Sequence, residues 1–294
     1  LAGFHLCQLT MAVSSALAVL GLNMVTGYSG HISLGHGAFY AIGAYTTVLL
    51  IEHGGWSFYA TLPVSAAFCA LVGYGVGFPA LRLSGLYLAR VTFSLAVAVP
   101  QILKHKAIEG WTGGVQGLFI TKPEPPAWLP FALNADQWMY LVALTVAALV
   151  FWGAWNLIHS RIGRALMATR DNPTAAEAMG MDIATLKTRA FAASAMVTGL
   201  AGSLSAAAIE FVAPDSFGFF VSITFFVGMV VGGVSSILGS VFGGVFVVFV
   251  PNIAETISRS APGVIYGVIL IVFLFLLPDG VAGLLRRIAA RLRR

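Results

Sequence analysis

The sequence predicts an all-α polytopic membrane protein with about nine transmembrane helices, and two observations carry the prediction. Of the 294 residues, 59% are hydrophobic and only 9% are charged, whereas a soluble domain carries about 25% charged residues. The apolar stretches are continuous, which excludes the alternating pattern of a membrane β-barrel. So few charges cannot cover a water-facing surface. A disordered chain, a disulfide-stabilised secreted scaffold and a soluble enzyme are therefore excluded.

The apolar stretches divide into spans at glycine-rich reversals. The first charged residue is Glu52, and the 51 residues before it are too many for one crossing, which needs about 20. Glycines and small polar residues at 27–37 mark a broken or re-entrant segment there, and residues 232–240 mark another. Eight to ten spans are compatible with this pattern. The expected nine are 5–26, 36–51, 58–80, 85–102, 138–158, 190–209, 217–234, 240–256 and 263–277.

Basic residues predict the orientation, because cytoplasmic loops carry an excess of Lys and Arg. Such residues crowd into the segment 160–189 and into the tail 280–294, so we expect both to be cytoplasmic. The segment 103–137 is then an external loop. This topology places eleven basic residues inside, Arg82 among them, and four outside, with Arg90 within a span. The sequence begins in an apolar stretch without Met, which suggests a missing upstream segment.

Motifs for covalent chemistry and for bound groups are absent from the sequence. It has no G-x-x-x-x-G-K-[ST] loop to hold ATP, no G-x-S-x-G or H-E-x-x-H motif, and no metal-ligand spacing among its six histidines. Cys7 and Cys69 lie in apolar stretches and are interpreted as small buried hydrophobes. The basic residues flank apolar stretches, as at a membrane surface, which gives no indication of nucleic-acid binding. We therefore expect no enzyme activity, metal or cofactor in this chain.

The basic segment 160–189 contains a predicted short helix at 173–179. Asp171 or Asn172 can cap it, Pro173 suits its first position, and Gly180 can end it. A capped helix that flanking arginines hold outside the bilayer suits contact with a soluble partner, although an inert loop fits the spacing equally well. Its small residues Ala175, Ala176 and Ala178 would face the partner's groove. The candidate contact residues are Arg164, Arg170, Asp171, Asn172, Pro173, Ala176, Glu177 and Gly180.

Polar side chains within the spans are candidates for a translocation pathway, since polar groups in a bilayer are costly. Hydrogen bonds between helices are the alternative role, and the more frequent one for Ser and Thr. Glycine pairs such as Gly228 with Gly232 and Gly263 with Gly267 are interpreted as helix-packing seams. The candidate pathway residues are Asn23, Thr26, Ser33, His36, Tyr40, Thr92, Ser94 and Gln101.

Several motifs, in order along the chain, resemble a known family. They are GLNMVTGYSG at 21–30, SLGHGAFYAIGAY at 33–45, the stretch from GRAL to Asp182 at 163–182, GLAG at 199–202 and PDG at 278–280. Together they resemble the LivM-type permease subunit of branched-chain amino acid ABC importers. The similarity covers nearly the whole chain.

The resemblance implies a single transmembrane permease domain over 1–294 in a bacterial inner membrane, with 160–189 as the loop that couples it to ATPases. The implied partners are a second related permease subunit, two cytoplasmic ATPase subunits that bind Mg-ATP, an external solute-binding protein and membrane lipid. The implied solute is a branched-chain or other hydrophobic amino acid. The family pattern places an acidic residue after the threonine that Thr92 matches, and none follows here. An aromatic acid, an amide or urea therefore stays an alternative, as does an ion-coupled secondary carrier.

Overall fold

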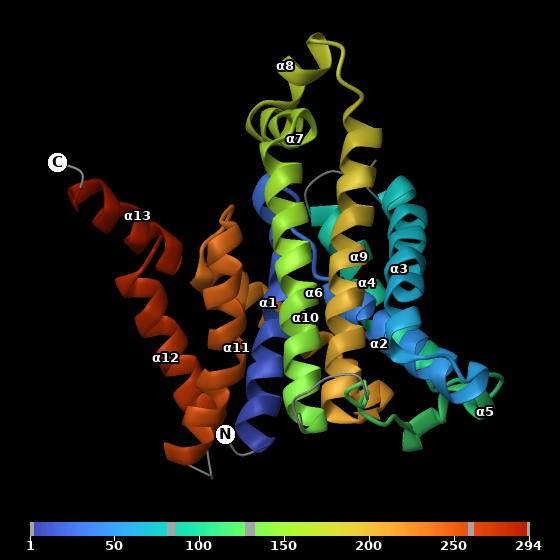
Figure 1. The fold of residues 1–294 in the computed structure, drawn as a ribbon. Helices are drawn as coiled ribbons and strands as arrows, with labels where there is room; N and C mark the ends of the chain where they lie inside the picture. Colours follow the sequence, from blue (N-terminus) through green and yellow to red (C-terminus); the bar gives the residue numbers. More distant parts are fainter. Residues whose placement is uncertain (1–2, 81–85, 127–132, 258–261, 293–294) are drawn as a thin grey trace.

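The structure, a computed structural model, describes residues 3–80, 86–126, 133–257 and 262–292, and within them it is almost entirely helical (Figure 1). Every apolar stretch expected as a span contains an α-helix. Four short helices lie outside these spans: α5 (Glu109–Thr112), α7 (Arg161–Asp171), α8 (Pro173–Ala178) and α13 (Gly280–Leu292). The apolar helices are α1 (Gly3–Ser29), α2 (His36–Gly54), α3 (Phe58–Ala80), α4 (Leu86–Leu103), α6 (Ala135–His159), α9 (Ile183–Ile209), α10 (Phe219–Gly232), α11 (Ile237–Ile257) and α12 (Pro262–Leu276).

Seven helical stretches among the described residues are long and apolar enough to cross a bilayer. They include α1, α3, α6, α9 and α11, together with Pro214–Gly232 and Gly263–Ile288. The remaining two expected spans are helical but are not among these seven. Helix α4 contributes only a shorter apolar helix, Tyr87–Leu103. Helix α2 contains Glu52 and two histidines. The prediction of an all-helical membrane protein is thus confirmed with seven candidate spans.

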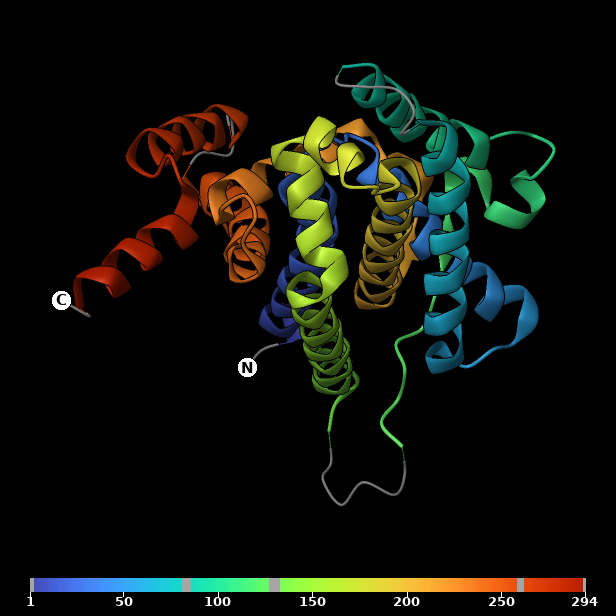
Figure 2. The same cartoon turned by 90° about the horizontal axis from the view of Figure 1, so that it is seen from above.

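Helices α1 and α9 form the centre of the bundle. They pack against each other, α1 also lies against α6 and α11, and α9 also lies against α2 and α3. Glycines permit this close packing: a Cβ atom on Gly43 of α2 would lie 2.0 Å from the carbonyl oxygen of Gly199 on α9. Helices α12 and α13 lie at one edge of the molecule, and α3 and α5 lie at the opposite edge (Figures 1 and 2).

The glycine pairs differ in what they do. Gly228 and Gly232 pack closely on Gly243 and Gly239 of the neighbouring helix, as expected of a seam. Around Gly263 and Gly267 of α12, by contrast, a Cβ atom would meet no described atom within 4 Å. The interpretation of that second pair as a packing seam within this chain is wrong, because α12 turns this side away from the bundle.

The helices alternate in direction, so the connecting segments gather at two ends of the bundle. One end holds α7, α8, the start of α9 and α13, and the other holds the start of α1, α5 and the segment that follows it (Figure 1). Both segments expected on the cytoplasmic side therefore lie at the same end. Arg82, which was expected there too, and Arg293 and Arg294 of the tail lie outside the described residues.

The end opposite α7 and α8 is partly non-helical. A two-residue strand, β1 (Leu118–Phe119), pairs antiparallel with β2 (Phe211–Val212). Nearby, Lys122 Nζ lies 2.8 Å from a carboxylate oxygen of Asp136 and 3.2 Å from one of Glu210. Burial lowers the pKa of Lys122, but its bonds to the two carboxylates outweigh that effect and raise the pKa. These ion pairs join the segment around Lys122 to the start of α6 and the end of α9.

Candidate functional site

The helices α7 and α8 are capped by side chains. Ser160 Oγ accepts hydrogen bonds from the backbone N–H groups of Ile162 and Gly163 at the start of α7. Asn172 Oδ1 accepts from the N–H of Ala175, 3.0 Å away, so Asn172 rather than Asp171 is the cap of α8. Pro173 occupies the first turn, and Gly180 follows the helix with φ +79°. The predicted helix is confirmed, ending at Ala178 rather than Met179.

The two sides of α8 differ in exposure. Ala176 is only 4% exposed and packs within the chain, so the expectation that its side chain lies on the outer face is wrong. Ala175, Glu177 and Ala178 are exposed, and Met179 is 80% exposed. The exposed surface of α8 is therefore made by these other residues.

Arg170 connects α7 to two distant parts of the chain. Its Nη1 donates to the carbonyl oxygen of Gly27 on α1 at 2.8 Å and to Ser235 Oγ at 3.0 Å. Ser235 Oγ in turn donates to the same Gly27 carbonyl. An ion pair with Asp171, 2.9 Å away, orients the guanidinium group. Arg164, by contrast, is exposed and donates to the carbonyl oxygen of His159.

Ser235 belongs to the second reversal (residues 233–236), which joins α10 to α11. Asn23 of α1 is fully buried and binds this turn with both ends of its amide. Its Oδ1 accepts from the N–H of Ser235 at 2.8 Å, and its Nδ2 donates to the carbonyl oxygen of Ser236 at 3.0 Å. These bonds hold Ser235 at φ +59°, a left-handed conformation that costs free energy for a residue other than glycine.

The first reversal (residues 30–35) joins α1 to α2, and it is held by buried hydroxyl groups. Ser33 Oγ and His36 Nδ1 lie 3.1 Å apart, and His36 Nε2 lies 2.6 Å from Ser194 Oγ on α9. Thr92 Oγ1 on α4 accepts from the N–H of Leu34. Ser194 is eleven residues into α9, about 16 Å along its axis. Helix α2 therefore begins deep inside the bundle, as expected of a re-entrant segment.

The other candidate pathway residues lie apart from these reversals. Tyr40 is buried with its ring against Phe217 and Phe225. Thr26 has a buried hydroxyl group with no hydrogen-bond partner among the described residues. Ser94 and Gln101 are exposed on α4. The structure thus brings Ser33, His36 and Thr92 together at the first reversal and places Asn23 at the second. The other four candidates lie apart from both reversals: Thr26, Tyr40, Ser94 and Gln101.

Comparison with known proteins shows the family to which the chain belongs. Over residues 6–277 the chain matches the family model described as the branched-chain amino acid transport system permease component. The chain belongs to this family. The resemblance seen in the motifs is confirmed by this match and by the identity with the LivM proteins described below.

Among its relatives, the permease protein LivM of the high-affinity branched-chain amino acid transport system of Escherichia coli (strain K12) is 35% identical over 246 residues. That match covers 77% of this chain but only 58% of LivM, so the chain spans little more than half of that relative. The probable branched-chain amino acid permease LivH of Methanocaldococcus jannaschii is 25% identical and is covered over 88% of its length. The autoinducer 2 import permease LsrC of Escherichia coli O9:H4 (strain HS) is 27% identical, with 83% of this chain and 71% of LsrC covered.

Three contacts of this site were not expected from the sequence. Ser194, which binds His36, was not among the candidates. Gly27 and Ser235 lie in the two glycine-rich stretches that mark the reversals, but their bonds to Arg170 were not expected. Within the described ranges, no three His, Cys, Asp or Glu side chains come together in a way that would hold a metal ion.

Proposed function

We propose that this chain is a permease subunit of an ABC importer that moves a hydrophobic amino acid, branched-chain amino acids included, across a bacterial inner membrane. Its family membership and its LivM relative support this proposal. In it, two ATPase subunits hold Mg-ATP, a second related permease completes the membrane part, and an external binding protein delivers the solute. The chain itself makes and breaks no covalent bond.

The observation that carries the proposal is the contact of Arg170 with both Gly27 and Ser235. A force applied to the exposed surface of α8 reaches α7, because the two helices pack on each other. Arg170 passes it to the end of α1 and to the second reversal. An inert loop would not need a guanidinium group that is bonded both to α1 and to the turn between α10 and α11. The α7–α8 segment is therefore the coupling element, on the cytoplasmic side of the membrane.

The pathway is assigned to the exposed face of α4. Arg90, Ser94 and Gln101 are exposed and follow one another at spacings of four and seven residues, so they form one polar stripe on an apolar helix. Arg90 lies in the second turn of α4 and brings a charge into an apolar helix, which is costly where it faces lipid. This stripe is accommodated when α4 faces the second permease across a hydrated pathway. With α2 and α4 counted as crossings in addition to the seven candidate spans, the chain crosses the membrane nine times.

The buried candidates have a different role in this proposal. Asn23, Ser33, His36 and Thr92 are at most 1% exposed, and hydrogen bonds within the bundle occupy them. They hold the two reversals in place, and the reversals move when the pathway opens. In this conformation, the exposed residues Ser94 and Gln101 are the candidates that contact the solute.

A transport assay tests the solute. The complex with its partner subunits and binding protein is reconstituted in liposomes loaded with ATP on the ATPase side, and uptake of labelled leucine is compared with that of an aromatic acid, an amide and urea. The proposal expects saturable leucine uptake that unlabelled valine or isoleucine inhibits. Uptake of urea or of an aromatic acid without leucine uptake would assign the same machinery to one of the alternative solutes. The comparison is needed because the relative LsrC is named as a permease for autoinducer 2 and not for an amino acid.

A further inference from the structure

Two cavities lie one after the other along one face of α6, beside α11, and together we call them the groove. The first, of about 360 Å³, has an almost wholly apolar lining, to which Leu144, Phe151 and Val245 contribute, and residues of α1 also line it. The second, of about 480 Å³, lies nearer the α7–α8 end. The α6 residues that line the two cavities, such as 144, 148, 151 and 155, share one helix face.

The second cavity differs from the first in its polar groups. Arg164, Arg286, His159 and Trp155 line it, and the rings of Trp155 and His159 stack with centroids 4.3 Å apart. Within the described part of the chain, no carboxylate forms an ion pair with Arg164 or Arg286. The groove thus joins an apolar channel to two arginines whose charge is not neutralised by an acidic side chain.

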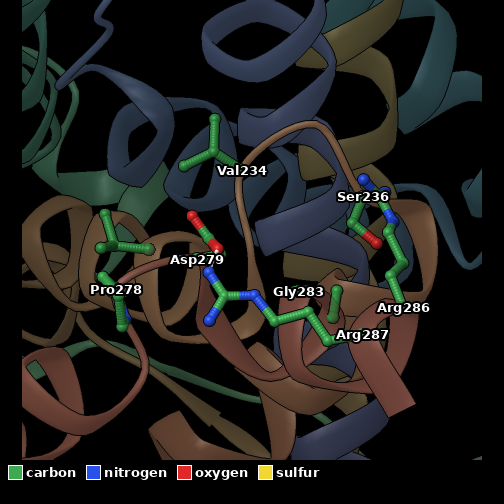
Figure 3. Close-up of a pocket in the computed structure, with 9 residues that line it drawn as sticks. Val234, Ser236, Pro278, Asp279, Gly283, Arg286 and Arg287 are labelled. Carbon is green, nitrogen blue, oxygen red and sulfur yellow. Dashed lines mark hydrogen bonds and ion pairs between the residues drawn. The ribbon is translucent and has the colours of Figure 1, made fainter. Parts of the chain in front are cut away.

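A neighbouring arginine provides a contrast. Figure 3 shows the adjoining cavity of about 440 Å³ between the second reversal and the start of α13. In it Arg287 extends toward Asp279, with which it forms an ion pair, whereas Arg286 extends toward Ser236. Arg286 lines both cavities. Of these two consecutive arginines, only Arg286 is therefore available to an anion in the groove.

We propose that this groove binds an anionic phospholipid of the leaflet on the α7–α8 side, with its phosphate between Arg164 and Arg286 and one acyl chain along Leu144 and Val245. The charge pattern selects the occupant. An apolar groove in a membrane accepts any acyl chain, but two guanidinium groups without a carboxylate partner among the described residues favour a negative headgroup at its end. Trp155 lies where aromatic residues usually mark the level of the headgroups.

The experiment measures lipid binding to the purified full chain in a neutral maltoside detergent, by native mass spectrometry and by thermal shift. Phosphatidylglycerol, phosphatidylcholine and inorganic phosphate are added separately. The proposal expects phosphatidylglycerol to bind and to raise the melting temperature, and the other two to have little effect. Each arginine near a membrane surface contributes about a fivefold gain in affinity for anionic lipid, so Arg164→Gln with Arg286→Gln should weaken binding roughly thirtyfold.

Two further variants separate the site from a general loss of folding. Arg287→Gln removes the same charge from the neighbouring position, where Asp279 already neutralises it, and should keep the affinity within about twofold. Ala148→Trp fills the apolar cavity and should weaken phosphatidylglycerol binding with both arginines intact. Equal binding of phosphatidylcholine, an equal effect of free phosphate, or an equal loss in Arg287→Gln would overturn the proposal. Displacement of the lipid by the second permease in the assembled complex would overturn it too.

Discussion

Arg170 and Gly27 are 143 residues apart in the sequence, yet Arg170 Nη1 donates a 2.8 Å hydrogen bond to the carbonyl oxygen of Gly27. Through Ser235, the same nitrogen also reaches the turn between α10 and α11. Helix α7 is thereby fixed to the end of α1 and to the turn between α10 and α11. Movement of α7 without movement of α1 or of this turn would require these bonds to break.

Replacing Arg170 tests this connection. Hydrogen bonds to charged groups each contribute about 1.5–3 kcal/mol, so Arg170→Gln should loosen α7 from α1 and reduce uptake by the complex roughly tenfold or more. ATP hydrolysis should continue but lose its dependence on substrate-loaded binding protein. Arg161→Gln, an exposed change on the same helix, is the matched control. Equal, normal uptake for both variants would show that Arg170 is not the link.

The amide of Asn23 is predicted to stabilise the second reversal. Asn23→Ala leaves the N–H of Ser235 without its partner, which costs about 1–3 kcal/mol. It also removes one hydrogen bond to the carbonyl oxygen of Ser236, which keeps those from the N–H and Oγ of Ser240. The melting temperature in detergent should therefore fall by several degrees. Asn252→Ala is the control, because its side chain bonds, within the described ranges, to Val248 of its own helix. It should have a much smaller effect. Indistinguishable melting temperatures would contradict the account.

The two sides of α8 predict two different outcomes for the same substitution. Ala178→Arg adds a long side chain to the exposed side and should leave the chain folded while it weakens ATPase binding roughly tenfold to a hundredfold, a cost of about 1–3 kcal/mol. Ala176→Arg forces the same side chain into a buried position and should lower the melting temperature as well. Pro173→Gly should do less than either. ATPase co-purification and thermal unfolding are measured for the three variants. Unchanged co-purification with Ala178→Arg would reject α8 as the docking surface.

Cysteine labelling tests the orientation. With Cys7 and Cys69 replaced, Thr121→Cys should react with a membrane-impermeant thiol reagent in intact cells. Thr174→Cys should react only after the inner membrane is opened. Both threonines are exposed, so access to the reagent depends only on the side of the membrane. The opposite labelling pattern would reverse the orientation inferred from the basic residues.

The local features of this chain were predictable from its sequence, and its long-range contacts were not. Helix α8 has only six residues. Its first residue, Pro173, and the flanking residues Asn172 and Gly180 were enough to predict it from their spacing. The inward position of Ala176 depends on how α8 packs on α7, which no local pattern encodes. The bonds of Asn23 to Ser235 and Ser236 join residues more than 200 positions apart. A buried polar residue is visible in a sequence, but its partner is set by the packing of whole helices.

The central claim is that this chain transports solute only when partner ATPases act on α7 and α8. The most direct measurement is leucine uptake into liposomes that contain this chain and its permease partner, with and without the two ATPase subunits and ATP, in the presence of the binding protein. The account predicts uptake against a gradient only with both ATPase and ATP, and none when an ion gradient replaces them. Concentrative uptake driven by an ion gradient without the ATPase subunits would contradict it and would identify a secondary carrier.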